Sequence, residues 1–283
     1  MLVWSTQVSH GKAEHAWVSW LTHTMSTQPA LFVSHGAPTL IITPGEARAF
    51  LSELGAQIPR PRAVLAVSAH WETAEPTVSL ALRPETIHDF SGFPRELYAM
   101  RYPAPGAVEL AQQTAALLSN AGFAARTDAS RGLDHGAWVP LKLMYPQADI
   151  PVTQLSVQTQ LGAQHHYRIG EALRPLRDDD VLILASGSAT HNLRELDWSG
   201  QGAVPEWVSN FSDWVAQAGA RGDVEQLLRY RQHAPAAARN HPTEEHFLPF
   251  FVALGAGSTP AHVSRIHAST TFGVLAMDAY RFD

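Results

Sequence analysis

Three apolar runs in this sequence lead at their carboxyl ends into small residues and then a histidine, and this repeated arrangement restricts the fold more than any other feature. The run "ALFV" leads to His35, "AVLAV" leads to His70 and "VLILA" leads to His191. Short continuous apolar runs are typical of strands that are buried on both faces of a sheet. Because ligands bind beyond the carboxyl ends of the strands in open α/β sheets, we expect these three histidines to converge.

Strand and helix patterns alternate from residue 29 onward, which predicts the fold class α/β. We expect a single domain with a central, mostly parallel or mixed sheet flanked by helices, and an active site at the strand carboxyl ends. Strands are predicted at 29–34, 62–69, 77–82, 151–157 and 180–186, with one or two more within 262–282. Helices are predicted at 45–56, 106–121, 161–176, 204–219, 222–232 and 243–254.

The composition excludes several kinds of chemistry and of partner. The chain has 283 residues and no cysteine, so any metal must be held by histidine, carboxylate or water. The formal net charge is -6 and no block of like charges occurs, so the basic surface of a nucleic-acid binder is missing. No apolar run approaches the roughly 18 residues of a membrane span, and no signal peptide is evident. We therefore expect a cytoplasmic protein with no nucleic-acid or membrane partner.

The beginning of the chain differs from the rest. Residues 1–24 are polar and carry scattered histidines without a strand pattern. We interpret 1–24 as an extension or upstream start with little structure, and 25–283 as the folded domain, with Met25 as the candidate start.

A lone histidine at a strand end is more often structural than a ligand, but three in the same structural position favour a shared metal. His246 is a fourth candidate. Thr243 is placed to cap the helix predicted at 243–254, which puts His246 in its first turn, where the positive helix end disfavours an imidazolium. A capping role for His246 is the alternative.

Other histidines are weaker candidates. His135, in "GLDHGAWVPL", is either a polar contact in the pocket or a turn residue. His88 lies in a stretch that can touch a substrate, or it is a solvated loop residue. We treat His165 and His166, at the start of a predicted helix, as surface residues. No serine lies in a G-x-S-x-G elbow and no phosphate-binding motif follows a strand.

The irregular stretch from Pro84 to Gly106 is too long for an ordinary connection, and such loops usually cover sites. Its aromatic and polar members suit a wall that contacts an aromatic ring and a polar substituent. We therefore predict that His88, Phe93 and Arg95 contact the substrate.

The chain resembles the class III extradiol ring-cleavage dioxygenases (LigB-like), in particular the branch of DOPA 4,5-dioxygenase-like proteins of bacteria and plants. The matching pieces are "SHGAP" at 34–38, "SAHW" at 68–71, "DHGAWVPL" at 134–141, "SGSATHNL" at 186–193, "HPTEEHFLPFFVALGA" at 241–256 and the terminal "STTFGVLAMDAYRF". Each piece is weak alone, but the ordered set extends over nearly the whole chain after Met25 and is specific.

This resemblance implies a catalytic domain at 25–283 that opens a catechol-type aromatic substrate with O2. It implies a non-haem Fe(II) site, with Zn(II) as the other metal that the same residues suit. His35, His70, His191 and His246 are implied around the metal. His191 is also implied as the acid and base of the reaction, and His135 is our second choice as a donor to the bound oxygen.

The sequence departs from the family pattern at one position. Where a two-histidine, one-carboxylate triad is usual, the aligned residue is His246, with Glu244 and Glu245 beside it. Two alternatives therefore stay open: a histidine-bound zinc hydrolase with Glu244 or Glu245 as the base, and a metal- or small-ligand-binding protein without activity. A homo-oligomer is compatible with the sequence, which does not indicate one.

Overall fold

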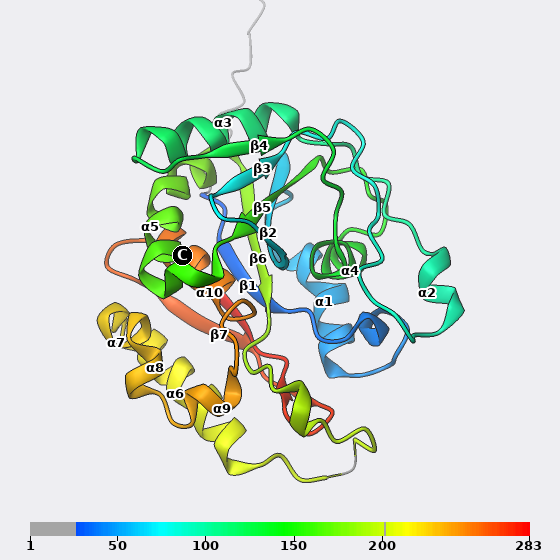
Figure 1. Cartoon of the computed structure of the whole chain (residues 1–283), viewed down its shortest axis with the longest axis vertical. Helices are drawn as coiled ribbons and strands as arrows, with labels where there is room; N and C mark the ends of the chain where they lie inside the picture. Colours follow the sequence, from blue (N-terminus) through cyan, green and yellow to red (C-terminus); the bar gives the residue numbers. More distant parts are fainter. Residues whose placement is uncertain (1–26, 201) are drawn as a thin grey trace, which may run out of the picture.

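Within residues 27–200 and 202–283, which the computed structural model describes, eight strands form one mixed sheet flanked by helices (Figure 1). The strands of this sheet are β1 (Ala30–Ser34), β2 (Ala63–Glu72), β3 (Thr77–Ser79), β4 (Arg126–Asp128), β5 (Val152–Val157), β6 (Val181–Gly187), β7 (Val263–His267) and β10 (Ala279–Phe282). They lie in the order β4-β3-β5-β2-β6-β1-β10-β7. The α/β fold class is confirmed. The interpretation of residues 1–24, and of Met25 as the start, concerns residues outside the described part.

The four central strands β5, β2, β6 and β1 are parallel, so their carboxyl ends meet at one edge of the sheet. Ser186 of β6 is in register with Val33 of β1 and with Ser68 of β2. Since β6 lies between β1 and β2, His35 and His70 do not follow adjacent strands, although the runs before them are consecutive among the three in the sequence. The strand that leads to His191 separates them, because chain order does not determine strand order when helical crossovers connect parallel strands.

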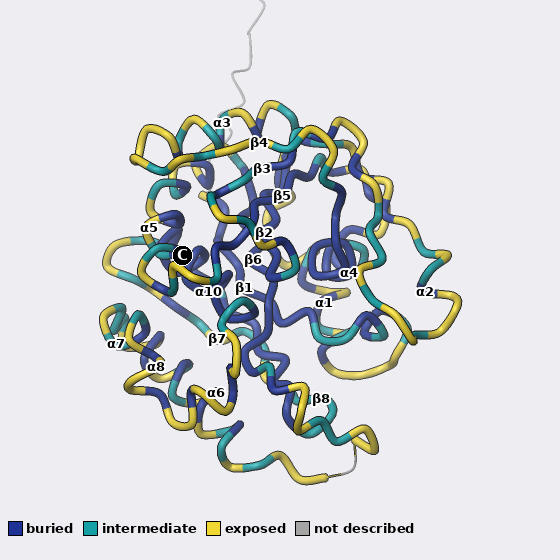
Figure 2. Tube along the Cα trace, in the orientation of Figure 1, coloured by how far each residue is buried: buried dark blue, intermediate teal, exposed yellow. Residues whose placement is uncertain are grey.

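Helices cover both faces of this sheet, with α5 and α10 on one side and α1 and α4 on the other (Figure 1). The helices are α1 (Glu46–Gln57), α2 (Arg95–Ala99), α3 (Val108–Asn120), α4 (His135–Met144), α5 (Gly162–Leu173), α6 (Glu206–Ala220), α7 (Val224–Leu228), α8 (Tyr230–His233), α9 (Ala237–Asn240) and α10 (Leu248–Ala256). Helix α10 is apolar all round and buried throughout, as Figure 2 shows, which is the pattern of a core helix.

Three local predictions are wrong. Thr243 caps no helix, because α10 begins only at Leu248 and His246 lies in the turn before it. His166 is buried, not on the surface, and its ring accepts a hydrogen bond from the backbone N–H of Gln158 at 3.1 Å. The helix predicted at 222–232 is divided into α7 and α8.

Helix α4 was not predicted, and its composition explains why. Every residue from His135 to Met144 except Lys142 is buried, so the segment has no polar face to show a helical period. Pro140 also lies inside it, where proline usually argues against a helix.

Two short strands, β8 (Thr270–Thr271) and β9 (Leu275–Ala276), form a separate ribbon. The stretch from Pro84 to Gly106 is mostly irregular, as predicted, and contains only α2 as a helix. None of the helices in the described ranges is long and apolar enough to cross a membrane.

Candidate active site

A cavity of about 360 Å³, which we call the catalytic cavity, lies beyond the carboxyl ends of the central strands. Five histidines line it, and they come from five separate segments: His35 after β1, His70 within β2, His135 at the start of α4, His191 after β6 and His246 before α10. The structure therefore brings together all the predicted metal and catalytic residues.

Three of the five imidazoles bring the same ring nitrogen to one point. The Nε2 atoms of His35 and His70 are 2.9 Å apart, and those of His246 and His70 are 3.3 Å apart. These three residues form a group whose ligand atoms all lie within 4.8 Å of one another. A single small cation between them could therefore contact all three.

The other ring nitrogen of each of these histidines faces an oxygen atom. His35 Nδ1 is 3.0 Å from Ser186 Oγ, and this hydroxyl donates its own hydrogen to the Gly136 carbonyl, so it must accept from Nδ1–H. His246 Nδ1 donates to Glu245 Oε1 at 2.9 Å. His70 Nδ1 is 3.5 Å from Asp89 Oδ2.

These contacts fit a bound metal. With Nδ1 protonated on His35, His70 and His246, each Nε2 presents a lone pair, and lone pairs that face one another at about 3 Å repel unless a cation lies between them. Two imidazole nitrogens that each lie about 2.1 Å from one metal ion, at about 90° to 105°, are roughly 3.0 to 3.3 Å apart. The observed separations of 2.9 and 3.3 Å agree with that geometry.

Burial keeps these imidazoles neutral. Burial first, and then the neighbouring imidazoles, hold the pKa of His35 and that of His246 well below the usual value. Burial and then His135 lower the pKa of His70 to about 4. A neutral imidazole is the form that can ligate a metal.

His135 is fixed by two carboxylates at the start of α4. Asp134 caps the helix by accepting from the backbone N–H of Ala137 at 3.2 Å. Asp89 accepts from both the backbone N–H and the Nδ1–H of His135, each at 2.9 Å. Burial raises the pKa of Asp89, but the hydrogen bonds and charge of His135 outweigh it and lower the pKa to about 2. Asp89 thus links His135 to His70 as an anion.

His191 is placed differently from the other four. Its ring stacks on that of His246, with centroids 3.4 Å apart and planes at 14°. No hydrogen bond within the described part of the chain engages this ring, and its Nδ1 is 4.0 Å from Glu245 Oε1. Burial first, and then His241, lower the pKa of His191 to about 3. This imidazole is therefore free to contact a molecule in the cavity.

The residues predicted to contact a substrate divide into two groups. Phe93 lines the catalytic cavity, together with Phe90. His88 does not line it: its Nε2 donates to the Met100 carbonyl at 3.1 Å, and its ring lies 5.7 Å from that of Phe90. Arg95 is exposed on α2 and does not line the cavity either.

The two neighbouring glutamates have different partners. Glu244 accepts a hydrogen bond from the Tyr230 hydroxyl at 2.6 Å, whereas Glu245 accepts from Thr243 and His246. Glu245 therefore orients His246.

Sequence reasoning missed Asp89 and Ser186 as partners of the histidines. Asp89 lies in an irregular loop without a periodic signal, and Ser186 is one of several small residues at a strand end, with nothing in the sequence to single it out. The spacing of residues in the sequence does not indicate that Asp89 lies beside His70 of "SAHW" in the fold.

The parallel strands of this α/β sheet end at a histidine cluster that can hold a metal, at the edge of the sheet where such folds bind their ligands. The family model described as "Catalytic LigB subunit of aromatic ring-opening dioxygenase" matches residues 29–277, and the chain belongs to this family. It is an extradiol ring-cleavage dioxygenase, and the dioxygenases of this family are metal-dependent.

Individual relatives agree with this assignment. A 4,5-DOPA dioxygenase extradiol from Beta vulgaris is 44% identical over 255 residues, which cover 89% of this chain and 95% of the relative. One from Escherichia coli K12 is 41% identical over 231 residues, covering 81% of this chain and 84% of the relative. A crystal structure of an uncharacterized protein from Escherichia coli K12 matches with a TM-score of 0.76 and 32% identity, covering 90% of this chain and 100% of that chain.

Proposed function

We propose that this dioxygenase uses Fe(II) held by His35, His70 and His246 to open the ring of a catechol with O2. The observation that carries this proposal is the convergence of the Nε2 atoms of these three histidines. Because the Nδ1 atom of each ring faces an oxygen atom, the lone pairs of the three Nε2 atoms face one another. When bound, the ferrous ion supplies a Lewis acid that lowers the phenolic pKa and holds the two reactants together. Imidazole also suits zinc, so Zn(II) is expected to compete for the same site.

The remaining two histidines have separate roles in this proposal. His191, whose ring is free of protein hydrogen bonds in the described part of the chain, accepts a phenolic proton from the catechol and returns it as the ring opens. His135, whose Nδ1–H is held by Asp89, turns its other nitrogen toward the reactants as a hydrogen-bond partner for oxygen. The stacking of His191 on His246 keeps the acid–base group beside the metal without making it a necessary ligand.

The substrate class follows from the cavity and from the relatives. Phe90 and Phe93 supply aromatic faces for a catechol ring. Several relatives carry the name 4,5-DOPA dioxygenase extradiol. We therefore propose a substituted catechol such as DOPA as the substrate.

Anaerobic reconstitution tests the proposal. The protein is loaded with Fe(II) or with Zn(II) without oxygen, and oxygen uptake is then measured with a panel of catechols. Uptake with Fe(II) and none with Zn(II) is expected. Turnover of an ester or amide by the zinc form without oxygen would instead support hydrolysis, with Glu244 or Glu245 as the base.

A substitution tests the role of His191. His191→Gln should keep its iron and lower turnover by about 100-fold to 10,000-fold, the usual span for an acid–base group. If iron is lost instead, His191 is a ligand, and if iron and turnover are both retained, His135 becomes the acid–base candidate. The cytoplasmic location, the oligomeric state and the lack of a nucleic-acid or membrane partner stay predictions.

A further inference from the structure

The turn that joins β8 to β9 places a phenylalanine in a backbone conformation that suits other residues better. Phe272 and Gly273 in this turn have φ of +50° and +69°. Left-handed backbone costs free energy for a residue with a Cβ, and glycine and asparagine adopt it most readily. The other residues besides glycine with positive φ in the described ranges are Ala148, Asp180 and Ala236, so Phe272 is the only aromatic one among them. The chain therefore has Phe272 at a position where asparagine or glycine would fold with less strain.

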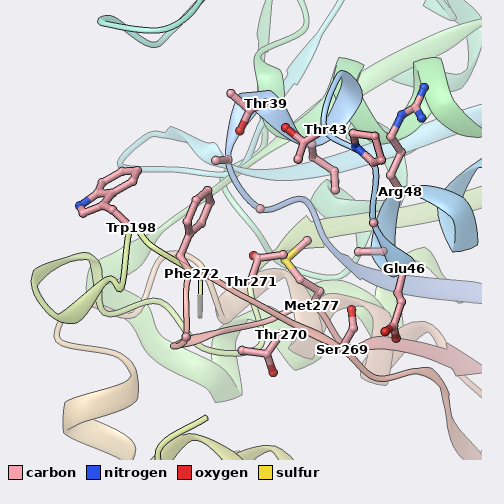
Figure 3. Close-up of a pocket in the computed structure, with 18 of the residues that line it drawn as sticks. Thr39, Thr43, Glu46, Arg48, Trp198, Ser269, Thr270, Thr271, Phe272 and Met277 are labelled. Carbon is pink, nitrogen blue, oxygen red and sulfur yellow. The ribbon is translucent and has the colours of Figure 1, made fainter. Parts of the chain in front are cut away.

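Phe272 is also the one residue of these four that lines a cavity. It lines the catalytic cavity and a neighbouring cavity of about 510 Å³, part of whose lining Figure 3 shows. Ala148, Asp180 and Ala236 line neither of the two. Residues in unfavourable backbone conformations gather at functional sites, because the surrounding contacts hold them in place there. The conformation and the position of Phe272 together indicate a role for its ring in the catalytic cavity.

The ribbon that carries Phe272 is fixed to the segment that carries His191. The buried hydroxyl of Thr190 donates to the Val274 carbonyl and accepts from the Ala276 backbone N–H, each at 2.7 Å. Thr190 directly precedes His191 in the chain. Because this one hydroxyl makes two bonds to the ribbon, the place of Phe272 relative to His191 is set by the fold.

A second segment holds the turn from the solvent side. The backbone N–H of Asp197 donates to the Phe272 carbonyl at 2.9 Å. The next residue, Trp198, lies with its ring beside that of Phe272 (Figure 3), at 5.2 Å between centroids, and it is 70% exposed although it lines the catalytic cavity. Among the described residues, no ring contact joins this pair to Phe90 or Phe93. Phe272 and Trp198 therefore form a second aromatic wall of the catalytic cavity.

We propose that Phe272 is a specificity-determining residue, whose ring contacts the ring of the catechol in the catalytic cavity. Aromatic rings attract one another in offset and edge-to-face contacts, and a ligand without a ring makes no such contact. The contact gives a reason for a phenylalanine at a backbone position that favours asparagine or glycine. This inference rests on the proposed function, because it requires a catechol bound at the histidine cluster.

Equilibrium binding without oxygen tests the role of Phe272 on the iron-loaded enzyme. One probe is 4-methylcatechol, and the other is acetohydroxamate, which offers two oxygen atoms to a metal but carries no ring. Phe272→Asn replaces the ring with a residue that the turn favours, Phe272→Leu keeps an apolar side chain without the ring, and Phe272→Tyr keeps the ring. Ala236→Asn is the matched control, because Ala236 is exposed, has φ of +49° and lines neither cavity.

We expect Phe272→Asn to weaken binding of 4-methylcatechol by about 5-fold to 50-fold, through loss of the ring contact and of the apolar area that it covers. Binding of acetohydroxamate should stay within about twofold, because the metal ligands are unchanged. The unfolding midpoint of Phe272→Asn should equal or exceed that of the parent enzyme, because asparagine suits the turn and the ring of Phe272 is only partly buried. Phe272→Tyr should bind both probes within about threefold of the parent, and Ala236→Asn should leave both unchanged.

Unchanged binding of 4-methylcatechol by Phe272→Asn would overturn the inference, and a lower unfolding midpoint alongside it would make Phe272 a packing residue. Equal weakening of both probes would overturn it as well, because the defect would then lie at the metal. If Phe272→Asn does not fold, Phe272→Leu decides, with 4-methylcatechol expected to weaken by about 2-fold to 10-fold and acetohydroxamate unchanged. Failure of the proposed function would appear in the parent enzyme itself, as no binding of 4-methylcatechol and no oxygen uptake with it.

Discussion

Replacing Asp89 by asparagine should lower the rate of ring cleavage by about 10-fold to 100-fold while the protein stays folded. The reason is that Asp89 orients two imidazoles of the site at once. One of its oxygens accepts from the backbone N–H of His135, and the other accepts from His135 Nδ1 and lies 3.5 Å from His70 Nδ1. Asparagine has one acceptor oxygen, so its NH2 group must face one of these N–H donors.

The expected magnitude follows from the bonds that are lost. A hydrogen bond to a charged group contributes about 1.5 to 3 kcal/mol, which corresponds to roughly 10-fold to 150-fold. We expect this loss to appear mainly in turnover, through the orientation of His135. The affinity for iron should fall less, because Ser186 and Glu245 still orient His35 and His246.

The assay combines single-turnover kinetics, iron titration and thermal unfolding on the same preparation. Asp128→Asn is the matched control, because Asp128 accepts hydrogen bonds from Ser130 and Arg131 in a different loop and lines neither cavity. It should leave turnover unchanged. A folded Asp89→Asn variant with the turnover of the parent enzyme would refute the reasoning, since His70 and His135 would then need no carboxylate.

Three further outcomes are expected. His35→Ala should lose most of its iron by metal analysis while the protein stays folded, and full occupancy would contradict the ligand set. Phe93→Ala should change the ranking of catechols by kcat/KM more than Arg95→Ala does, because Phe93 lines the catalytic cavity and Arg95 does not. Equal effects of the two substitutions would contradict a contact between Phe93 and the substrate. Gly255→Ala should lower the free energy of unfolding by about 1 to 3 kcal/mol in denaturant titrations, because a Cβ there would lie 2.0 Å from the Tyr167 carbonyl oxygen. An unchanged unfolding midpoint would contradict the close packing of α5 on α10.

The parts of the site that could be predicted from the sequence are those that end a strand. His35, His70 and His191 follow apolar runs, and such runs identify buried strands without any knowledge of their neighbours. The order of the strands could not be predicted in this way, because it depends on the crossovers. For this reason the sequence does not predict that β6 lies between β1 and β2.

The parts that could not be predicted depend on contacts between distant segments. His135 was ambiguous because α4 is buried on nearly every side and shows no helical period. Asp89 lies 46 residues before His135 in a loop that has no pattern to interpret. The roles of Glu244 and Glu245 were open because adjacent residues in a turn point in different directions, here toward Tyr230 and toward His246.

The small residues at the strand ends explain why this edge of the sheet can hold a preorganised cluster. Ser186 of β6 fixes the ring of His35, which follows the neighbouring strand β1. Ser68 of β2 donates to Asp134 at 2.6 Å, and Asp134 caps the helix that begins at His135. Parallel register places both serines at the same level of the sheet. These two strand ends therefore orient histidines carried by other segments, so the geometry of the cluster depends on the register of the sheet as well as on the loop that carries Asp89.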